Sequence, residues 1–427
     1  MKLMVFLLFL ICSGLAMANP VPMVRGMNLT QWGEDYIYDA APAGKPKTPA
    51  QLGVDKIKQL GATHVVLNPQ ARMTDPRGSD VIPEVSVAQR VQERARYKRL
   101  IDYIHSQGMT VGIRPIFFVV GPNGEFPYHE TQPDGSVITW WHGNIQPKDV
   151  NRWFESFKQF HDIYLLIARL NNVAEYTIGA ELYSMTVGIE DQWQEYPFGF
   201  PGKWLQLLRY TRSKLKPNTR IMYDINFTDD RASTNGELNA LGGELERWRY
   251  RLVDLAEPAN PAEREIWQDL VTFWNELDAI GIDIYRSLAS KTDRIPLIYA
   301  DLVSLLRVRA DEYAGQMDVT LAEISSVTEK EQVMIFKEVG FRSITKGFIN
   351  PFDYEDGQGT YNEDHQAAAY EALYLSFWEP NFPWFRGASF WDVSVYPNRN
   401  RGIGDTGFSP AGKPMTMKVL KKIFGHQ

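Results

Sequence analysis

The chain has 427 residues, of which 44% are hydrophobic, 13% aromatic and 23% charged, with 45 Lys and Arg against 52 Asp and Glu. This composition can bury a core and excludes wholesale disorder, while the net charge of −7 argues against a basic nucleic-acid-binding face. The single Cys excludes an internal disulfide and zinc clusters built on Cys, which leaves an acidic, aromatic-rich soluble enzyme or binding protein.

The first eighteen residues have the pattern of a secretion signal. Lys2 precedes an apolar run from Leu3 to Cys12, and the small residues of Ala16-Met17-Ala18 follow. A membrane span needs ~20 apolar residues, and this run is interrupted at Ser13-Gly14. We expect residues 1–18 to be a signal peptide that is cut after Ala18, with the mature protein secreted or periplasmic. No later segment is long and apolar enough to predict a membrane anchor.

Short apolar runs then alternate with amphipathic stretches of helical length. This alternation predicts a parallel sheet, and eight strands point to a (β/α)8 barrel. We expect one domain, residues 19–427. The predicted strands are residues 24–29, 64–68, 110–115, 175–180, 220–224, 279–284, 333–336 and 387–390.

Two helices are well marked between these strands. Val87 to His105 and Val150 to Leu170 carry apolar residues at helical spacing, and each ends at Gly or Asn residues. The stretches between Gly121 and Gly143 and between Phe227 and Trp274 are predicted to be long loops.

Polar residues stand at the carboxyl ends of several predicted strands, where this fold places its chemistry. Strand four ends at Ala180-Glu181, strand six at Asp283-Ile284-Tyr285 and strand eight at Trp391-Asp392, and Glu338 follows strand seven. A lone Glu in such a place is more often a satisfied loop carboxylate than a catalytic one. Two Glu on strands four and seven face each other across the barrel mouth, and that favours catalysis.

Several segments carry a resemblance to a known family. The chain resembles the retaining glycoside hydrolases of clan A, and most specifically glycoside hydrolase family 113, whose described members are β-1,4-mannanases. The segments are Trp141-His142-Gly143-Asn144-Ile145 with Trp153-Phe154, Ile178 to Leu182, Phe273-Trp274 with Asp278 to Tyr285, Lys337 to Ser343, and Gly407 to Pro410 with Lys413-Pro414.

The resemblance implies that Glu181 is the general acid/base and Glu338 the nucleophile. Retaining hydrolysis uses two carboxyl groups ~5–5.5 Å apart, one protonated and one ionised. We expect the acid to have a raised pKa, and the nucleophile to be kept ionised by hydrogen-bond donors, with Tyr285 the expected donor.

Other residues are expected to bind the substrate. Trp391 would form an apolar floor under the sugar at the cleaved bond, although core packing is an alternative for it. Arg72 either supplies positive charge or pairs on the surface with Asp75 or Asp80. For Trp141, as for Trp32 and Trp140, sugar binding and core packing are equally expected. Position alone suggests Asn28, Asn68, Asp224, Asn226 and Asp283 as partners of sugar hydroxyls.

The sequence departs from the family pattern at two places. Many clan A enzymes have Asn directly before the acid/base, where it contacts the sugar 2-hydroxyl, and here that residue is Ala180. We expect Ala180 to leave room for a different C2 substituent or orientation. The stretch from Tyr285 to Glu338 is long, which makes Glu323 a rival nucleophile, although residues 318–331 favour an added helix.

The remaining alternatives concern cofactors and substrate. We expect no cofactor and no metal, because the seven His residues form no metal motif and the acidic loop Asp353 to Asp356 resembles an ordinary solvated run. The expected partner is a polysaccharide or oligosaccharide, with no nucleic acid and no membrane, and we expect a monomer. β-1,4-Mannan is the implied substrate. The alternatives are a β-glucan, an amino-sugar polymer, a barrel that binds glycan without cutting it, or an unrelated metal-dependent hydrolase.

Overall fold

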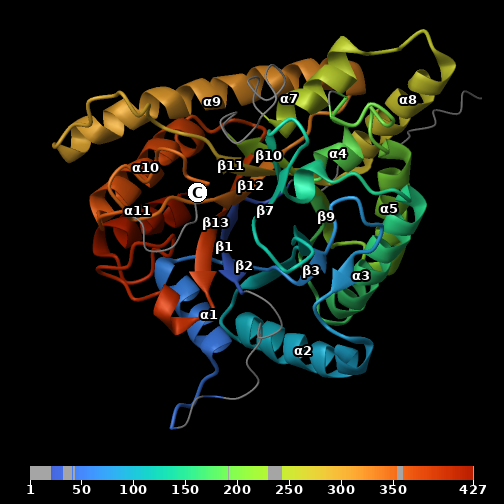
Figure 1. Cartoon of the computed structure of the whole chain (residues 1–427). Coiled ribbons are helices and arrows are strands. Elements are labelled where there is room, and N and C mark those ends of the chain that lie inside the picture. Colours follow the sequence, from blue (N-terminus) through green and yellow to red (C-terminus); the bar gives the residue numbers. More distant parts are fainter. Residues whose placement is uncertain are drawn as a thin grey trace, which may run out of the picture.

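The computed structural model describes residues 21–31, 41, 44–190, 192–228, 243–352 and 359–426 (Figure 1). The predicted signal peptide, Trp32 and the acidic loop Asp353 to Asp356 lie outside these residues.

Eight parallel strands form a closed barrel in the order β1-β13-β12-β11-β10-β9-β5-β2, which confirms the predicted (β/α)8 fold. Each barrel strand overlaps one of the predicted runs. The strands are β1 (Val24–Thr30), β2 (His64–Leu67), β5 (Thr110–Ile113), β9 (Glu175–Ala180), β10 (Arg220–Thr228), β11 (Ala279–Tyr285), β12 (Met334–Val339) and β13 (Phe385–Ser394).

Helices surround this barrel (Figure 1). The helix predicted from Val150 is α3, with the predicted bounds, because Asp149 caps its first turn by accepting from the Arg152 N–H. The α-helices are α1 (Pro49–Leu60), α2 (Arg90–Ser106), α3 (Val150–Leu170), α4 (Tyr183–Thr186), α5 (Pro201–Lys214), α7 (Glu244–Arg249), α8 (Pro261–Glu276), α9 (Tyr299–Thr328), α10 (Glu363–Leu373) and α11 (Pro414–Gly425). Single turns are η2 (Val87–Gln89), η3 (His142–Asn144), η5 (Tyr250–Asp254), η6 (Tyr374–Trp378) and η7 (Pro397–Arg399).

Both predicted long loops contain regular structure, so that prediction was wrong. Helices α7 and α8 occupy much of the second stretch, and α8 begins where Asn260 accepts from the Ala262 N–H and Pro261 fits the first helical position. The first stretch folds into an antiparallel hairpin of β7 (Tyr128–Thr131) and β8 (Val137–Trp140). The turn between its strands contains Asp134 and Gly135, and Gly135 has the positive φ of 84° that favours glycine.

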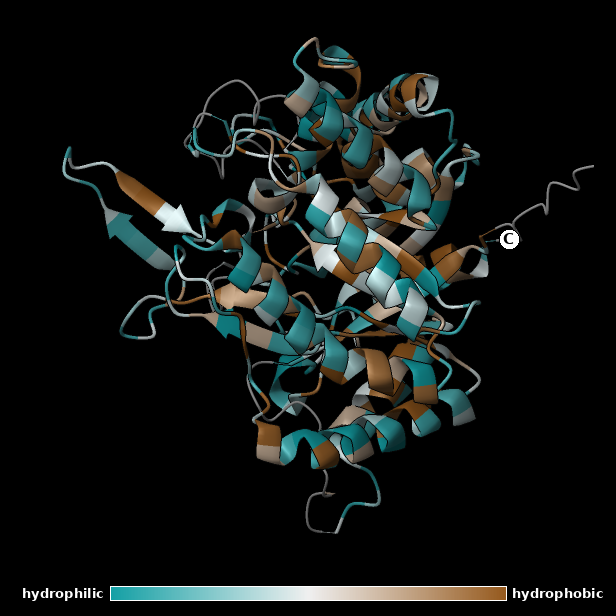
Figure 2. Ribbon diagram, turned by 90° about the vertical axis from the view of Figure 1, so that its right-hand side faces the viewer, coloured by the Kyte–Doolittle hydropathy of each residue, from teal (hydrophilic) through white to brown (hydrophobic). Residues whose placement is uncertain are grey.

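A small second sheet supports this hairpin region. Strands β3 (Gln70–Met73) and β6 (Ile116–Val119) run parallel after β2 and β5, and β4 (Ile82–Pro83) pairs on the outer side of β3. Figure 2 shows the hairpin projecting from the barrel, with a hydrophobic β8 beside a hydrophilic β7. The small sheet and the hairpin thus extend the structure beyond the carboxyl ends of β2 and β5.

The core is rich in aromatic rings. The indoles of Trp153, Trp204, Trp248 and Trp274 are fully buried, and the Trp153, Trp204 and Trp248 rings each pack within 6.5 Å of another aromatic ring centroid in the core. Much of the tryptophan content therefore belongs to packing between barrel and helices. Among the described residues, no helix has the length and apolar composition required to cross a membrane.

Candidate active site

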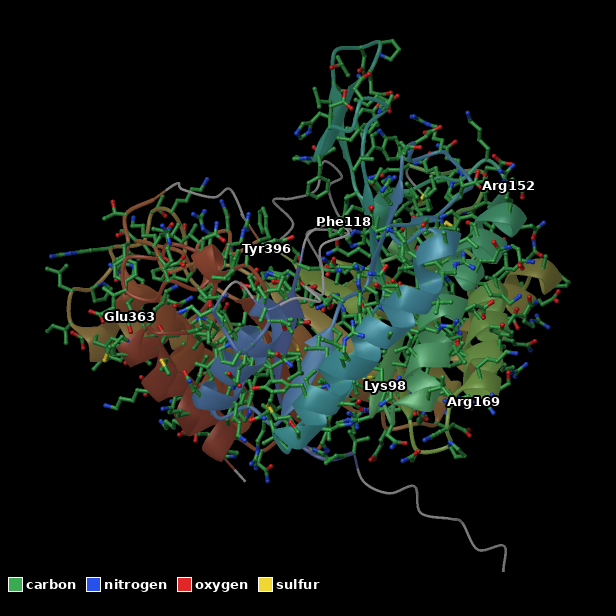
Figure 3. All side chains as sticks on the ribbon, turned by 90° about the horizontal axis from the view of Figure 1, so that it is seen from below. Lys98, Phe118, Arg152, Arg169, Glu363 and Tyr396 are labelled. Atoms are coloured by element: carbon green, nitrogen blue, oxygen red, sulfur yellow. The ribbon has the colours of Figure 1, made fainter. Side chains whose placement is uncertain are left out.

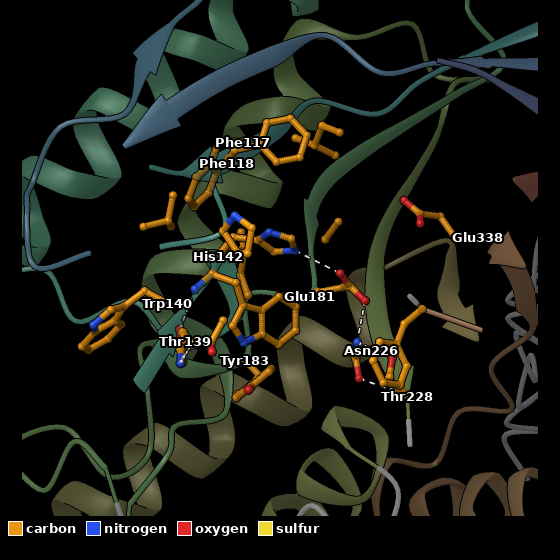
Figure 4. A pocket seen from close by; sticks show the side chains of 18 of the residues that line it. Phe117, Phe118, Thr139, Trp140, His142, Glu181, Tyr183, Asn226, Thr228 and Glu338 are labelled. Atoms are coloured by element: carbon orange, nitrogen blue, oxygen red, sulfur yellow. Dashed lines mark hydrogen bonds and ion pairs between the residues drawn. The ribbon is translucent and has the colours of Figure 1, made fainter. Parts of the chain in front are cut away.

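A cavity of about 500 Å³ opens at the carboxyl ends of the barrel strands (Figure 4). This volume is in the usual range for binding sites of small molecules. Six of the eight predicted site residues line it: Glu181, Glu338, Tyr285, Trp391, Asn226 and Trp141. Arg72 and Asp283 are not among the lining residues.

Glu181 follows the last residue of β9 and has a positive φ of 55°. Its backbone N–H donates to the Asp224 carbonyl oxygen at 2.8 Å, which fixes this sharp turn. The carboxyl Oε2 lies 3.0 Å from His142 Nε2, and Oε1 accepts from Asn226 Nδ2 at 2.5 Å (Figure 4). Burial favours the neutral acid, but His142 and Asn226 outweigh it and hold the pKa of Glu181 below its usual value. This direction is opposite to the raised pKa expected of an acid.

Glu338 lies on β12 and approaches the cavity from another wall (Figure 4). Tyr285 Oη donates to Oε2 at 2.9 Å, as expected, and Arg114 Nη1 donates to Oε1 at 2.5 Å. Burial raises the pKa of Glu338 above its usual value, and the nearby charge of Glu181 adds to this, against the lowering effects of Arg114 and Tyr285. The two carboxyl groups therefore interact electrostatically, and the raised pKa of Glu338 is opposite to the ionised state expected of a nucleophile.

Arg114 is the centre of a buried charge cluster inside the barrel. Directly after β5, its guanidinium donates to Asp224 Oδ2 at 2.6 Å, to Asp283 Oδ2 at 2.5 Å and to Glu338. Its side chain is only 2% exposed, so one cation serves three carboxyl groups in a dry environment. Burial and these neighbouring carboxylates keep the pKa of Asp283 well above its usual value, despite the opposing effect of Arg114.

Two predicted substrate-binding residues therefore have other partners. The Arg72 side chain is 42% exposed and pairs with Glu84 at 2.5 Å, so the positive charge beside Glu338 comes from Arg114 instead. Asp283 is fully buried against Arg114, beneath the surface of the cavity.

The remaining polar candidates also serve the barrel. Asp224 is bound by Arg114, and Asn28 Nδ2 donates to the Lys337 carbonyl oxygen at 2.8 Å while its Oδ1 accepts from Asn68 Nδ2 at 3.2 Å. All three side chains are buried, and none is among the lining residues. They connect strands and do not line the cavity.

Aromatic side chains orient the groups around Glu181. The Trp141 ring meets the His142 ring edge-on at a centroid distance of 4.8 Å, and it contacts Tyr183 at 5.6 Å. Trp141 thus both lines the cavity and holds His142 in place. Trp391 lines the cavity from β13, close to Gly340, where a Cβ would lie 2.6 Å from the Trp391 carbonyl oxygen.

Behind Asn226 lies a further buried carboxyl group, Glu244 at the start of α7. It accepts from Tyr223 Oη at 2.8 Å, from the Asn226 backbone N–H at 3.0 Å and from Trp248 Nε1 at 3.1 Å. Burial raises the pKa of Glu244 to about 8. Because Tyr223 also accepts from the Leu182 N–H, Glu244 is linked through Tyr223 to the residue after Glu181, and directly to the Asn226 backbone.

Glu323, the rival nucleophile, is not among the residues that line the cavity. It lies within helix α9, as the interpretation of residues 318–331 as a helix predicted, and pairs with Arg249. Among the described residues, no group of three or more His, Cys, Asp or Glu side chains is arranged to hold a metal ion.

Sequence reasoning assigned no role to Arg114, His142 or Glu244. For Arg114 a signal existed, since a charged residue ends an apolar strand just as Glu181 does. His142 lies in a segment quoted for the family resemblance, but nothing in that segment indicates its contact with Glu181. Glu244 follows no strand, and no signal marks it.

Comparison with known proteins supports the resemblance in one part of the chain. The model of Glycoside Hydrolase Family 113 matches residues 260–413, which contain Tyr285, Glu338 and Trp391 but not Glu181 or Arg114. A comparison with curated proteins finds no match.

Solved structures are similar in fold over nearly the whole chain. A family 113 β-mannanase from Alicyclobacillus acidocaldarius has 16% identity and a TM-score of 0.60, covering 94% of this chain and 97% of its own. A further structure, titled as a family 113 β-1,4-mannanase, has 16% identity and a TM-score of 0.60, covering 95% of this chain and 100% of its own. The chain thus resembles glycoside hydrolases of family 113 and clan A, and the match indicates a glycosidase.

Proposed function

We propose that the protein is an exported, retaining β-glycanase that cleaves β-1,4-mannan, with Glu181 as acid/base and Glu338 as nucleophile. The observation that carries the proposal is the pair of carboxyl groups from β9 and β12 in one cavity, each with its own donors. Export rests on the apolar segment before Ala18, and the choice of mannan rests on the family 113 relatives.

In the first step, the Glu338 carboxylate attacks the anomeric carbon while Glu181 gives its proton to the glycosidic oxygen. The glycosidic bond breaks and a glycosyl ester on Glu338 forms. In the second step, Glu181 takes a proton from water, the water oxygen attacks the same carbon, and Glu338 leaves. The sugar product keeps its anomeric configuration.

The partners of the two carboxyl groups support this division of roles. Arg114 is only a donor and is permanently charged, so it favours the ionised form of Glu338. His142 Nε2 is a donor in one protonation state and an acceptor in another, so its contact with Glu181 persists when Glu181 carries the proton. The carboxyl groups interact, and a proton bound by the pair is not fixed to one of them. We assign that proton to Glu181 once a substrate is bound.

The position next to the acid/base bears on the sugar that is accepted. Ala180 lines the cavity without any polar group, and the Asn226 amide is already engaged by Glu181 and by Thr228 Oγ1 at 2.8 Å. A substituent at C2 larger than hydroxyl has room beside a methyl group. This observation favours an amino-sugar β-glycan as the second candidate substrate.

The test is product analysis on mannans, β-glucans and amino-sugar glycans, using the wild type beside Glu338→Gln. We expect wild-type cleavage of mannan with retention of the anomeric configuration, observed by NMR at early times, and a loss of about 10⁴-fold or more in Glu338→Gln. Equal activity of the two proteins would reject the nucleophile, and an inverted product would reject the retaining mechanism.

The substrate is tested by Ala180→Asn in the same panel. If the cavity is adapted to a modified C2, this variant loses activity on amino-sugar glycans. A gain on plain mannan with nothing lost elsewhere would contradict the second candidate.

A further inference from the structure

The catalytic cavity continues beyond the two carboxyl groups along an apolar wall. The wall consists of Phe118 on β6 and of Phe126, Pro127 and Ile138 on the hairpin arm, which we define as residues 121–140. These four residues line the same cavity as Glu181 and Glu338, so the wall and the candidate site share one open space.

The wall presents aromatic surface to water. Phe126 is 44% exposed, although phenylalanine is among the residues most often buried. Its ring meets that of Phe118 edge-on at a centroid distance of 5.4 Å, at the foot of the arm (Figure 3). Exposed aromatic surface that adjoins a binding cavity indicates an interaction site.

The arm that carries this wall is held by contacts at its base, both within the arm and to Arg77 in the segment between β3 and β4. Trp140 at its base is 2% exposed, and its Nε1 donates to Glu130 Oε2 at 2.7 Å. Arg77 donates to Glu130 Oε1 at 3.1 Å and lies over the Trp140 ring at 4.7 Å. The aromatic groups are therefore held in place before any ligand arrives, which reduces the entropy lost on binding.

The wall lies on the side of the acid/base. In Figure 4, Phe118 is beyond His142 and Glu181, on the side away from Glu338. The acid must reach the glycosidic oxygen, which joins the anomeric carbon to the leaving group, while the nucleophile reaches the anomeric carbon itself. The direction from Glu338 through Glu181 therefore leads to the leaving-group half of the substrate.

We propose that the apolar wall of the hairpin arm binds the sugars on the leaving-group side of the cleaved bond, and so adapts the enzyme to polymers. Sugar rings expose apolar C–H faces, which pack on aromatic rings and exclude water. The inference rests on the proposed function, because it takes its direction from the roles of Glu181 and Glu338.

The experiment compares wild type with the double variant Phe118→Ala/Phe126→Ala on two substrates. Mannohexaose places sugars on the wall, whereas nitrophenyl β-mannobioside has no sugar on its leaving-group side. We expect the ratio of kcat/KM for the hexaose to that for the aryl glycoside to fall about tenfold or more in the double variant. Val137→Ala is the matched control, since Val137 is 48% exposed on the same arm but does not line the cavity.

Binding measured without turnover separates this inference from the proposed function. In the Glu338→Gln background, the Phe118→Ala/Phe126→Ala change is expected to weaken mannohexaose binding about tenfold in calorimetry, with mannobiose affected less. The wall proposal alone would be rejected if the enzyme cleaves the aryl glycoside but the double variant changes neither the ratio of the two kcat/KM values nor the hexaose affinity. If the wild type cleaves neither substrate but the double variant still loses hexaose affinity, the wall binds glycan, while the catalytic proposal and the assignment to the leaving-group side are both rejected.

Discussion

Glu181 and Glu338 each accept from one neutral donor, Asn226 or Tyr285, and differ in the basic side chain that they face. Glu338 faces the permanently charged Arg114, and Glu181 faces the imidazole of His142. A carboxyl group that alternates between acid and base has to gain and lose a proton in every cycle. An imidazole accommodates both states without any movement of heavy atoms, and a guanidinium does not.

His142→Phe tests this difference through the pH profile. Phenylalanine keeps a ring against Trp141 but removes the nitrogen that lowers the pKa of Glu181, so that pKa is expected to rise. In the proposed mechanism Glu181 has to be protonated to act as the acid, so activity is expected to fall as pH rises through its pKa. The alkaline limb of kcat/KM should therefore move to higher pH in the variant.

The measurement is kcat/KM for an aryl β-glycoside across pH, with His105→Phe as the control on an exposed part of α2. An alkaline limb that stays at the wild-type pH in His142→Phe would contradict a role for His142 in setting the proton affinity of Glu181.

The sequence supplied the two carboxyl groups but not the charges around them. Glu181, Glu338 and Tyr285 end apolar strands, and strand ends meet at one face of the barrel whatever the details of packing. Arg72 lies on β3, shortly after barrel strand β2, and pairs with Glu84, whereas Arg114 directly follows β5 and pairs with the buried Asp224. Arg114 enters the barrel because Asp224 and Asp283 are buried there to receive it. Their position relative to each arginine depends on how distant strands pack, which the local sequence does not show.

At the scale of elements, helix α7 connects strand β10 of the barrel to Glu181, the proposed acid/base. Its first residue, Glu244, holds Tyr223 and the Asn226 backbone on β10. Asn226 is part of β10 because this strand continues to Thr228, four residues beyond its predicted end, in register with β11. The buried carboxyl group therefore fixes the strand segment that donates to Glu181.

Glu244→Gln tests the protonation of this group through thermal stability. The folded-state pKa of about 8 lies above the ordinary value of about 4.3, so the folded state binds the proton more tightly than the unfolded state. This contribution to stability is complete below pH 4 and is lost as pH rises towards and through 8. From pH 5 to pH 8 the wild type should lose on the order of a few kcal/mol through this group.

Glutamine cannot titrate, so melting temperatures measured from pH 5 to pH 8 should fall less steeply in Glu244→Gln than in the wild type. The slope is the decisive quantity, because a uniform loss of stability would reflect only the changed hydrogen bonds. Parallel slopes for the two proteins would show that Glu244 is ionised throughout this range.

Helices and strands could be predicted where their burial leaves a recognisable pattern of apolar residues in the sequence. The barrel strands are apolar on both faces, so their sequences stand out as short runs. Helix α8 has Pro261 at its first position and buries Leu270, Phe273 and Trp274 at helical spacing, so the sequence carried a helix signal that the loop prediction missed. The hairpin strands carry no apolar period, and their place is set by Arg77 and Trp140.

At the scale of the whole molecule, Arg114 connects opposite sides of the barrel. Arg114→Met would remove the cation that is hydrogen-bonded to the buried Asp224 and Asp283, which typically costs about 3–5 kcal/mol. The loss should be largest near neutral pH and should shrink in acid, where both carboxyl groups take up protons. Denaturant unfolding at pH 4.5 and pH 7.5 measures both effects.

Arg152→Met is the matched control for this prediction. Arg152 pairs with Asp80 at 2.7 Å, but both side chains are more than half exposed, so its loss should cost less than about 1 kcal/mol. A similar cost for the two variants would show that the buried cluster contributes no more than a surface pair.

The same cluster has a consequence for how the chain is made. Arg114 is synthesised 110, 169 and 224 residues before Asp224, Asp283 and Glu338 respectively. A growing chain that has completed only β1, β2 and β5 carries a cation whose place in the finished barrel is dry and whose counter-charges do not yet exist. Water is the better environment for that arginine until β10, β11 and β12 follow. Barrel closure is thereby tied to completion of the carboxyl-terminal half, and the order of synthesis itself opposes premature collapse.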